Sequence, residues 1–283
     1  MLLSSLSFSL MQVVVKISAT TVGTLQQVFW RNLISMLITF VLLKKKKIPF
    51  WAERSYRAPL FLRSFFGFIG VIMLFAATAG ARQADIAVLN RTSPIWVSFF
   101  AFLFLKEKPS KVQLPVILLC LAGAAVAMQP SFESNTLPMI LALLTAVACG
   151  LAYTMIAFCK GHVDPLTVIF NFSLFSTAAG GILILPGFAV PGWKDMLMLV
   201  LIGVFGAGGQ IGLTYSYQKA PAAEVSIYDY SGIIFSALLG YFLLDEPLSL
   251  PTLLGALLIT AGGLWSYLYN QRQAKKAAGA LAG

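Results

Sequence analysis

The chain has 283 residues, of which 59% are hydrophobic and 11% are charged, with 20 Lys and Arg against 10 Asp and Glu. A soluble domain carries about 25% charged residues, so this composition excludes an ordinary soluble protein. The three cysteines give neither a disulfide framework nor a metal-ligand spacing, and we expect no metal and no cofactor.

Ten apolar runs follow one another, most of them near the length that crosses a hydrocarbon core of about 30 Å. Backbone groups in lipid have no water to bind, so each run is expected to form a helix. The expected spans are 2–20, 26–43, 59–80, 84–105, 112–129, 137–158, 165–186, 194–217, 222–244 and 251–269. The linkers between them are short, and successive helices are therefore expected to be antiparallel neighbours.

A repeat organises these spans. Residues 81–123 align without a gap on residues 220–262, which lie 139 positions further along the chain. The rarer matches are Asp85 with Glu224, Glu107 with Glu246, and Gly123 with Gly262. A fixed internal period predicts two half-proteins of five helices each.

The distribution of charge predicts the orientation. With the N-terminus in the cytoplasm, most Lys and Arg lie in or beside cytoplasmic linkers, including Lys44–Lys47, Arg57 and Arg63, while only Arg82 and Lys194 lie outside. Cytoplasmic loops are the ones enriched in Lys and Arg, so both termini are expected in the cytoplasm. The net positive charge then reflects topology, and no nucleic-acid partner is expected.

Five spans in each half is an odd number, so the second half enters the membrane from the opposite side. The predicted fold class is an all-α polytopic membrane protein, with ten transmembrane helices as two inverted five-helix repeats. The expected units are residues 1–129, residues 137–270 and a basic, disordered cytoplasmic tail at 271–283. Inverted repeats are common in secondary transporters, with the site near the midplane between them.

Polar side chains recur at helical spacing within several spans and predict a central cavity, since polar groups rarely face lipid. A Ser or Thr hydroxyl also binds its own helix backbone, so packing is an alternative for those stripes. The expected substrate-binding residues are Trp30, Arg31, Asn90, Arg91, Tyr153, Asn171, Gln210, Tyr228 and Asp229.

Asp229 is the acid placed clearly within a span, and the repeat sets Asn90 at the equivalent position. It is the candidate coupling residue, with protons as a candidate coupling ion. Three roles stay open for this carboxylate: proton coupling, recognition of a substrate amine, and neutralisation of Arg31, Arg91 or Lys16. Glu107 and Glu246 sit at span ends, where we expect them to cap or brace the hairpins.

Several of these residues together carry a resemblance that covers nearly the whole chain. Lys16, Arg31, the segment from Ala84 through Pro94 to Glu107, Gly123 and the segment 226–232 with Glu246 and Gly262 form the pattern. The chain resembles the ten-span drug/metabolite transporter superfamily of the type with EamA domains. The resemblance implies a transporter of the bacterial inner membrane, in a group of mostly exporters of amino acids, other metabolites or drugs.

The sequence therefore predicts a secondary active transporter that moves a small metabolite or drug by alternating access, with export favoured. An importer or exchanger of the same fold is an alternative. A membrane-embedded enzyme is the alternative from another class, but the spans supply neither a carboxylate dyad nor a serine–histidine pair. The expected partners are a small-molecule substrate and the lipid bilayer, and the sequence indicates no oligomeric state.

Overall fold

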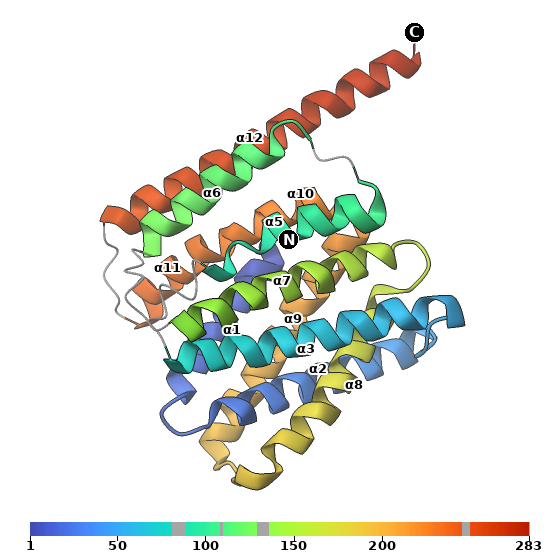
Figure 1. Ribbon diagram of the computed structural model, residues 1–283. Helices are drawn as coiled ribbons and strands as arrows, with labels where there is room; N and C mark the ends of the chain where they lie inside the picture. Colours follow the sequence, from blue (N-terminus) through green and yellow to red (C-terminus); the bar gives the residue numbers. More distant parts are fainter. Residues whose placement is uncertain (81–88, 108–109, 129–135, 245–249, 283) are drawn as a thin grey trace.

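The computed structural model describes residues 1–80, 89–107, 110–128, 136–244 and 250–282, and every regular element in these ranges is helical (Figure 1). The elements of the first half are α1 Leu2–Ser18, α2 Thr24–Lys46, η1 Arg54–Tyr56, α3 Arg57–Gly80, α5 Ser93–Phe100, η2 Ala101–Leu105 and α6 Gln113–Met128. Those of the second half are α7 Thr136–Phe158, α8 Pro165–Ile184, η3 Leu185–Gly187, α9 Trp193–Lys219, α10 Ala222–Ile227, η4 Tyr228–Tyr230, α11 Ser231–Leu244 and α12 Leu250–Ala282.

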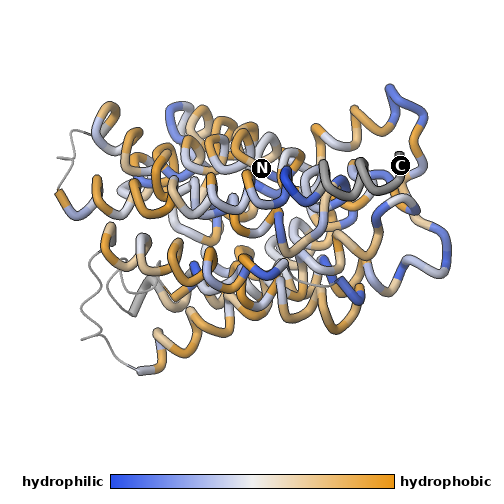
Figure 2. Tube along the Cα trace, turned by 90° about the horizontal axis from the view of Figure 1, so that it is seen from above, coloured by the Kyte–Doolittle hydropathy of each residue, from blue (hydrophilic) through white to orange (hydrophobic). Residues whose placement is uncertain are grey.

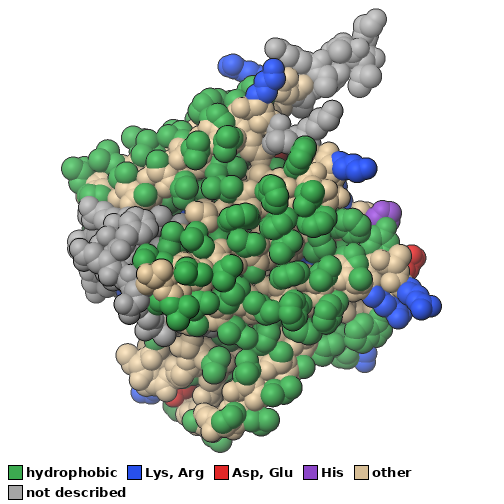
Figure 3. Space-filling view, viewed as in Figure 1, with side chains coloured by type: hydrophobic (Ala, Val, Ile, Leu, Met, Phe, Trp, Pro, Cys, Tyr) green, Lys and Arg blue, Asp and Glu red, His purple; other side chains and the backbone are tan. Residues whose placement is uncertain are grey.

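The helices have the length and polarity of a polytopic membrane protein. Seven of the described helical segments are long and apolar enough to cross a membrane, and three shorter apolar ones lie at Leu2–Ser18, Ser93–Leu105 and Gln113–Ala127. Hydrophobic side chains cover the visible flank of the molecule, and most Lys and Arg gather at one end (Figure 3). Hydropathy along the chain follows the same division, with hydrophilic residues concentrated at that end (Figure 2).

Helices that occupy equivalent places in the two repeats pack against one another. α6 lies along α12, and α2 lies against α8 (Figure 1). In the first pair, a Cβ on Gly123 would meet the Gly255 carbonyl oxygen at 2.9 Å, while one on Gly262 would meet the Cys120 sulfur at 2.6 Å. These contacts run antiparallel, and the small residues let two backbones approach closely, as transmembrane helix interfaces commonly require.

The other contacts between helices of different halves occur in equivalent pairs. α3 packs on α7, and the equivalent pair of the other half, α9 and α1, is also in contact. Likewise α5 packs on α7 and α11 packs on α1. The arrangement of neighbours is therefore preserved when the two halves are interchanged.

Two segments differ from their expected boundaries. The expected spans 84–105 and 222–244 are not continuous α-helices: the first turns at Arg91 and Thr92, and the second narrows to a 3₁₀ turn at Tyr228–Tyr230. The tail from residue 271, expected to be disordered, continues α12 to Ala282. The expected start of the fourth span, with Asp85, and Glu246, which follows the expected ninth span, lie outside the described residues.

One basic residue does not lie where charge counting placed it. Arg63 was assigned to the cytoplasmic face, but its residue exposure is 2%, and it sits in the second turn of α3. The side chain lies against the helix at Gly67 and over the ring of Phe172, at 4.1 Å to the ring centroid. The side chain of a cation close to the end of an apolar run can point into the protein or toward the cytoplasm. The sequence alone does not distinguish these two positions.

Candidate functional site

The two breaks in the helices are chemically alike and fall at equivalent positions of the repeat. Thr92 donates its hydroxyl hydrogen bond to the Leu89 carbonyl at 2.7 Å, and Ser231, 139 residues further on, donates to the Tyr228 carbonyl at 2.7 Å. Such hydroxyl-to-backbone bonds compete with the regular helix ladder. In the first half Pro94, in the first turn of α5, fits because its missing N–H leaves no helical bond unmade.

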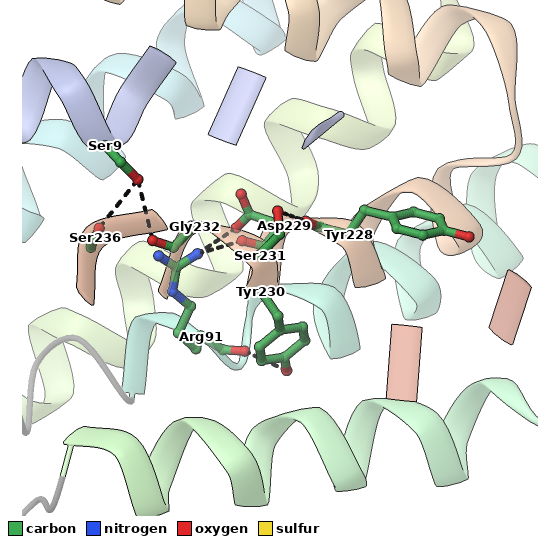
Figure 4. A network of polar contacts seen from close by, with 8 residues as sticks. All are labelled: Ser9, Arg91, Tyr228, Asp229, Tyr230, Ser231, Gly232 and Ser236. Carbon is green, nitrogen blue, oxygen red and sulfur yellow. Dashed lines mark hydrogen bonds and ion pairs between the residues drawn. The ribbon is translucent and has the colours of Figure 1, made fainter. Parts of the chain in front are cut away.

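An ion pair joins the two breaks (Figure 4). Arg91 Nη1 donates to Asp229 Oδ2 at 3.0 Å and to the Asp229 carbonyl at 3.0 Å. The Tyr230 hydroxyl donates in return to the Arg91 carbonyl at 2.8 Å. The two charged side chains are 19% and 25% exposed, so the pair is partly open to its surroundings. Of the three roles open for Asp229, the geometry supplies a cationic partner, and that partner is Arg91.

The first helix is tied to the second break by hydroxyl groups. Ser9 in α1 donates to the Gly232 carbonyl at 3.2 Å, and its oxygen lies 3.2 Å from the Ser236 hydroxyl (Figure 4). Gly232 lies in the first turn of α11, so its carbonyl oxygen accepts this hydroxyl with its second lone pair, beside its bond within the helix. This contact links an element of the first half to the broken helix of the second.

Three pairs of equivalent helices meet near the same place in the repeat, and in two of them the contact joins residues that the 139-residue shift makes equivalent. Ser173 and Ser35 share a hydrogen bond of 3.1 Å between α8 and α2 and are 138 positions apart. Tyr230 and Arg91 are 139 positions apart, as are Cys120 and Ile259, whose sulfur and carbonyl oxygen lie 3.9 Å apart. Contacts of a residue with its own mate are the ones that lie on a two-fold axis.

A second group of polar side chains lies among α2, α3, α7 and α9. Tyr153 stacks on Tyr217 with 5.1 Å between ring centroids, and Tyr153 also shares a side-chain hydrogen bond with Cys149, one turn earlier in α7. Tyr153 interacts electrostatically with both Arg63 and Asp229. The tyrosine thus connects the crossing of the broken helices with the buried arginines.

The two arginines of this group differ from Arg91. Arg31 lies 3.2 Å from the position a Cβ on Gly206 would take, and its contacts are a 3.4 Å hydrogen bond to Asn32 and the ring of Phe8. Arg63 has the ring of Phe172 as its cation–π partner. The Nε atoms of both are buried and have no hydrogen-bond partner among the described residues. Among those residues Arg91 and Asp229 form the one ion pair.

The structure brings some of the expected site residues together and separates others. Arg91 pairs with Asp229, and Tyr153 interacts with Arg31. Trp30 adjoins Arg31 on α2, with a buried indole N–H that has no described partner, and the Asn90 side-chain oxygen is likewise unpartnered. Gln210 is buried and donates to Thr214 one turn along α9 at 3.3 Å.

Tyr228 and Asn171 lie at separate cavities. Tyr228 lines a cavity of about 360 Å³ with Tyr215 and Lys219, at the junction of α9 and α10. Asn171 lines one of about 320 Å³ beside α3 and donates to the carbonyls of Phe50 and Thr167 at 3.0 and 2.8 Å. Arg63, in turn, was missed by sequence reasoning; the signal that points to it is Gly67, one turn further along the same helix.

A known protein family shows the same division of the chain into two similar halves. The model of the EamA-like transporter family matches residues 1–129 and again residues 136–268. The chain belongs to this family. Two matches in one chain, each over about half of it, agree with the repeated packing described above.

Several relatives are named as transporters. The chain is 28% identical to an uncharacterised transporter of Helicobacter pylori over 93% of this chain and 91% of the relative. It is 28% identical to the pseudopaline exporter CntI of Pseudomonas aeruginosa, over 91% and 90%, and 25% identical to a riboflavin transporter of Rhizobium johnstonii, over 98% and 93%. A solved protein structure at 15% identity has a TM-score of 0.77 and covers 95% of this chain and 97% of its own, which shows the fold.

These matches identify a membrane transporter and not an enzyme. Among the described residues, no group of three His, Cys, Asp or Glu side chains lies close enough together to hold a metal ion. What the EamA-like transporter offers instead is an intramembrane ion pair between two helix breaks, with tyrosines and two further arginines beside it.

Proposed function

We propose that this EamA-like transporter is a secondary active exporter, which moves a small organic solute out of the cytoplasm by alternating access. The observation that carries the proposal is the meeting of two broken helices at Arg91, Asp229 and Tyr230. Discontinuous helices near the midplane are where secondary transporters place substrate and coupling ions. The relative named as a pseudopaline exporter supports the direction of transport and a small-molecule cargo.

The moving parts in this proposal are two inverted repeats, residues 1–129 and 137–270. Supporting it, the antiparallel contact of α6 with α12 joins residues 139 positions apart, and that of α2 with α8 joins residues 138 positions apart. Equivalent contacts on one axis allow the halves to exchange roles when the protein rocks. The site is then reached from one side of the membrane in one state and from the other side in the second.

The proposed location is the inner membrane of a bacterium, with both termini in the cytoplasm. Supporting this orientation, the linkers after α2 and α7 and the end of α9 carry Lys44–Lys47, Lys160 and Lys219. Positive charge in short loops is retained on the cytoplasmic side. Substrate-binding roles are proposed for Trp30, Arg31, Asn90, Arg91, Tyr153, Gln210 and Asp229, and peripheral ones for Asn171 and Tyr228 at the two cavities.

In this proposal Asp229 couples transport to protons through its bond with Arg91. A proton on the carboxylate removes its charge and weakens the attraction to the guanidinium, so the crossing of the two breaks loosens. The partial exposure of the pair gives the carboxylate a route to water. A proton that binds and leaves at this point changes the same contact that holds the two halves together.

The test is efflux from vesicles that contain the purified protein. The vesicles are loaded with a ¹³C-labelled metabolite extract of bacterial cells, and the solutes that leave are identified by mass spectrometry. We expect one solute or a few related solutes to leave faster than from protein-free vesicles, and faster still with an inward proton gradient. Equal loss of all solutes from both kinds of vesicle would overturn the proposal.

A further inference from the structure

Arg63, which is buried, and Arg31, which is partly buried, are cations that the ion pair at the helix breaks does not use. Arg63 has 2% residue exposure, and its Nε has no hydrogen-bond partner among the described residues. Arg31 Nε is in the same condition. A guanidinium carries five N–H donors and stays protonated in proteins, so burial does not remove its charge. A buried charge of this kind needs an anion.

The described side chains around Arg63 supply no such anion. Its electrostatic neighbours are Tyr153, Cys149 and Arg31, the last of which repels it. The Asp229 carboxylate interacts with Tyr153 and Cys149 but forms its ion pair with Arg91. The two positive groups therefore act on each other electrostatically, and the other polar side chains of this group, Tyr153 and Cys149, are neutral.

The local packing holds the Arg63 side chain in a defined place. A Cβ on Gly67 would collide with Arg63 Nη1, so glycine at this position leaves room for the guanidinium to lie back along α3. The Phe172 ring covers one face of the group at 4.1 Å. A guanidinium with one face stacked keeps its edge free, and its edge is what binds carboxylate or phosphate oxygens in pairs.

We propose that the solute carries an oxyanion, a carboxylate or phosphate group, which binds between Arg63 and Arg31. Tyr153, which interacts electrostatically with both arginines, would then lie beside the bound group. This inference rests on the proposed transport function and names the substrate class of that site. In the ligand-free protein the two arginines repel each other, and the oxyanion removes that repulsion as it binds.

The test compares Arg63→Gln with Arg54→Gln. The control removes an equal charge from an exposed position in η1, the short 3₁₀ helix directly before α3. Both variants and the wild type are reconstituted in vesicles loaded with the ¹³C-labelled bacterial extract. We expect the solutes that leave wild-type vesicles to be acids. Their efflux should fall at least 10-fold in Arg63→Gln and stay within 2-fold of wild type in Arg54→Gln.

A second measurement separates binding from folding. Because Arg63 has no anionic partner among the described residues, Arg63→Gln should melt at the wild-type temperature or above it. The acid identified by efflux should raise the melting temperature of the wild type and of Arg54→Gln, but not that of Arg63→Gln. Comparing the acid with its amide derivative, and carboxylates with phosphates among the exported solutes, shows which oxyanion is bound.

The outcomes are distinct. Export of solutes that are only neutral or cationic overturns the oxyanion site while leaving the transport function intact. Acid efflux that is unchanged in Arg63→Gln has the same consequence. Loss of stability in ligand-free Arg63→Gln shows that the cation is structural, and contradicts the inference. If no solute leaves wild-type vesicles, the proposed function itself fails.

Discussion

Charged side chains within the helices of this EamA-like transporter fall into two kinds. Arg91 and Asp229 neutralise each other at 3.0 Å across the two halves. Arg31 and Arg63 have aromatic neighbours but no carboxylate partner among the described residues. A charge at mid-membrane costs roughly 2.5–3.5 kcal/mol on insertion scales, so unpaired cations are retained for a function and not for stability.

Asp229→Asn should impair transport and also reduce stability. The amide keeps the size and one hydrogen bond but leaves Arg91 without its counter-charge. The pair is partly exposed, so we expect a loss of about 1–3 kcal/mol, between the values of surface and buried ion pairs. Thermal unfolding and vesicle efflux measure the two effects separately.

The double variant Arg91→Gln/Asp229→Asn is the control for this prediction. Removing both charges should restore the melting temperature to near that of the wild type, while efflux stays low because the proton-binding carboxylate is absent. Restored efflux in the double variant would show that the pair only neutralises charge. Proton coupling by Asp229 would then be wrong.

For single residues, the sequence predicted which side chains are charged or polar in the site better than it predicted where they lie. It indicated Asp229 and named Arg91 as one of three possible partners, since a lone carboxylate in lipid needs a cation. It did not place Arg63 inside, because a cation in the second turn of an apolar run fits either a helix end or a buried site. It also grouped Asn171 and Tyr228 with the centre, although these residues line two separate cavities.

The helices are defined by close packing at small residues and by capping at their broken ends. Hydropathy predicted where helices lie because lipid requires continuous apolar runs. Hydropathy did not predict the helix breaks, since residues 222–244 are apolar on both sides of Tyr228. Pro94 signalled the first break, and the aligned Thr92 and Ser231 carry the shared hydrogen-bond pattern that a repeat comparison shows only when the structure is in hand.

Gly255→Ala should destabilise the pairing of α12 with α6. The added methyl group would run into the Gly123 carbonyl and the Ala127 side chain. Overpacking of this kind costs about 1–3 kcal/mol. Gly263→Ala, in the same helix, has no atom within 4 Å of the added Cβ and is expected to melt at or slightly above the wild-type temperature. Equal melting of both variants would show that the two helices are not packed as described.

Glu107 of the first half caps the first helix of the broken pair in the second half. The Ala222 backbone N–H donates to Glu107 Oε1 at 3.3 Å, at the start of α10. This contact agrees with the capping role expected from the sequence. Loss of a cap costs about 0.5–2 kcal/mol, so Glu107→Ala should lower the melting temperature, and Glu107→Gln, which keeps the acceptor, should not. A Glu107→Gln variant as unstable as Glu107→Ala would assign the effect to charge.

At the scale of the whole molecule, equivalent helices of the two halves meet at residues 138 or 139 positions apart. The sequence predicted the repeat and its inversion from the 139-residue shift and from an odd number of spans per half. It could not predict which helices meet on the axis, because packing between helices in lipid depends on the shapes of small side chains. The structure places Ser35 with Ser173, Arg91 with Tyr230, and Cys120 with Ile259.

Cysteines at positions 35 and 173 should form a disulfide when the protein is oxidised in membranes. The two serine oxygens are 3.1 Å apart, between α2 and α8. The variant Ser35→Cys/Ser173→Cys is made in a background in which Cys120, Cys149 and Cys159 are replaced by alanine. Cysteines at 35 and 177 form the control. A disulfide that forms as readily in the control would contradict the contact on the axis.

The claim that the two halves move relative to each other is tested most directly by a disulfide that links one half to the other. Ser9 in α1 and Ser236 in α11 lie 3.2 Å apart and belong to different halves. In the same cysteine-free background, oxidised Ser9→Cys/Ser236→Cys should stop solute efflux from vesicles, and a reductant should restore it, while either single cysteine variant transports under both conditions. Efflux at the unmodified rate through the fully cross-linked protein would contradict alternating access by the two halves.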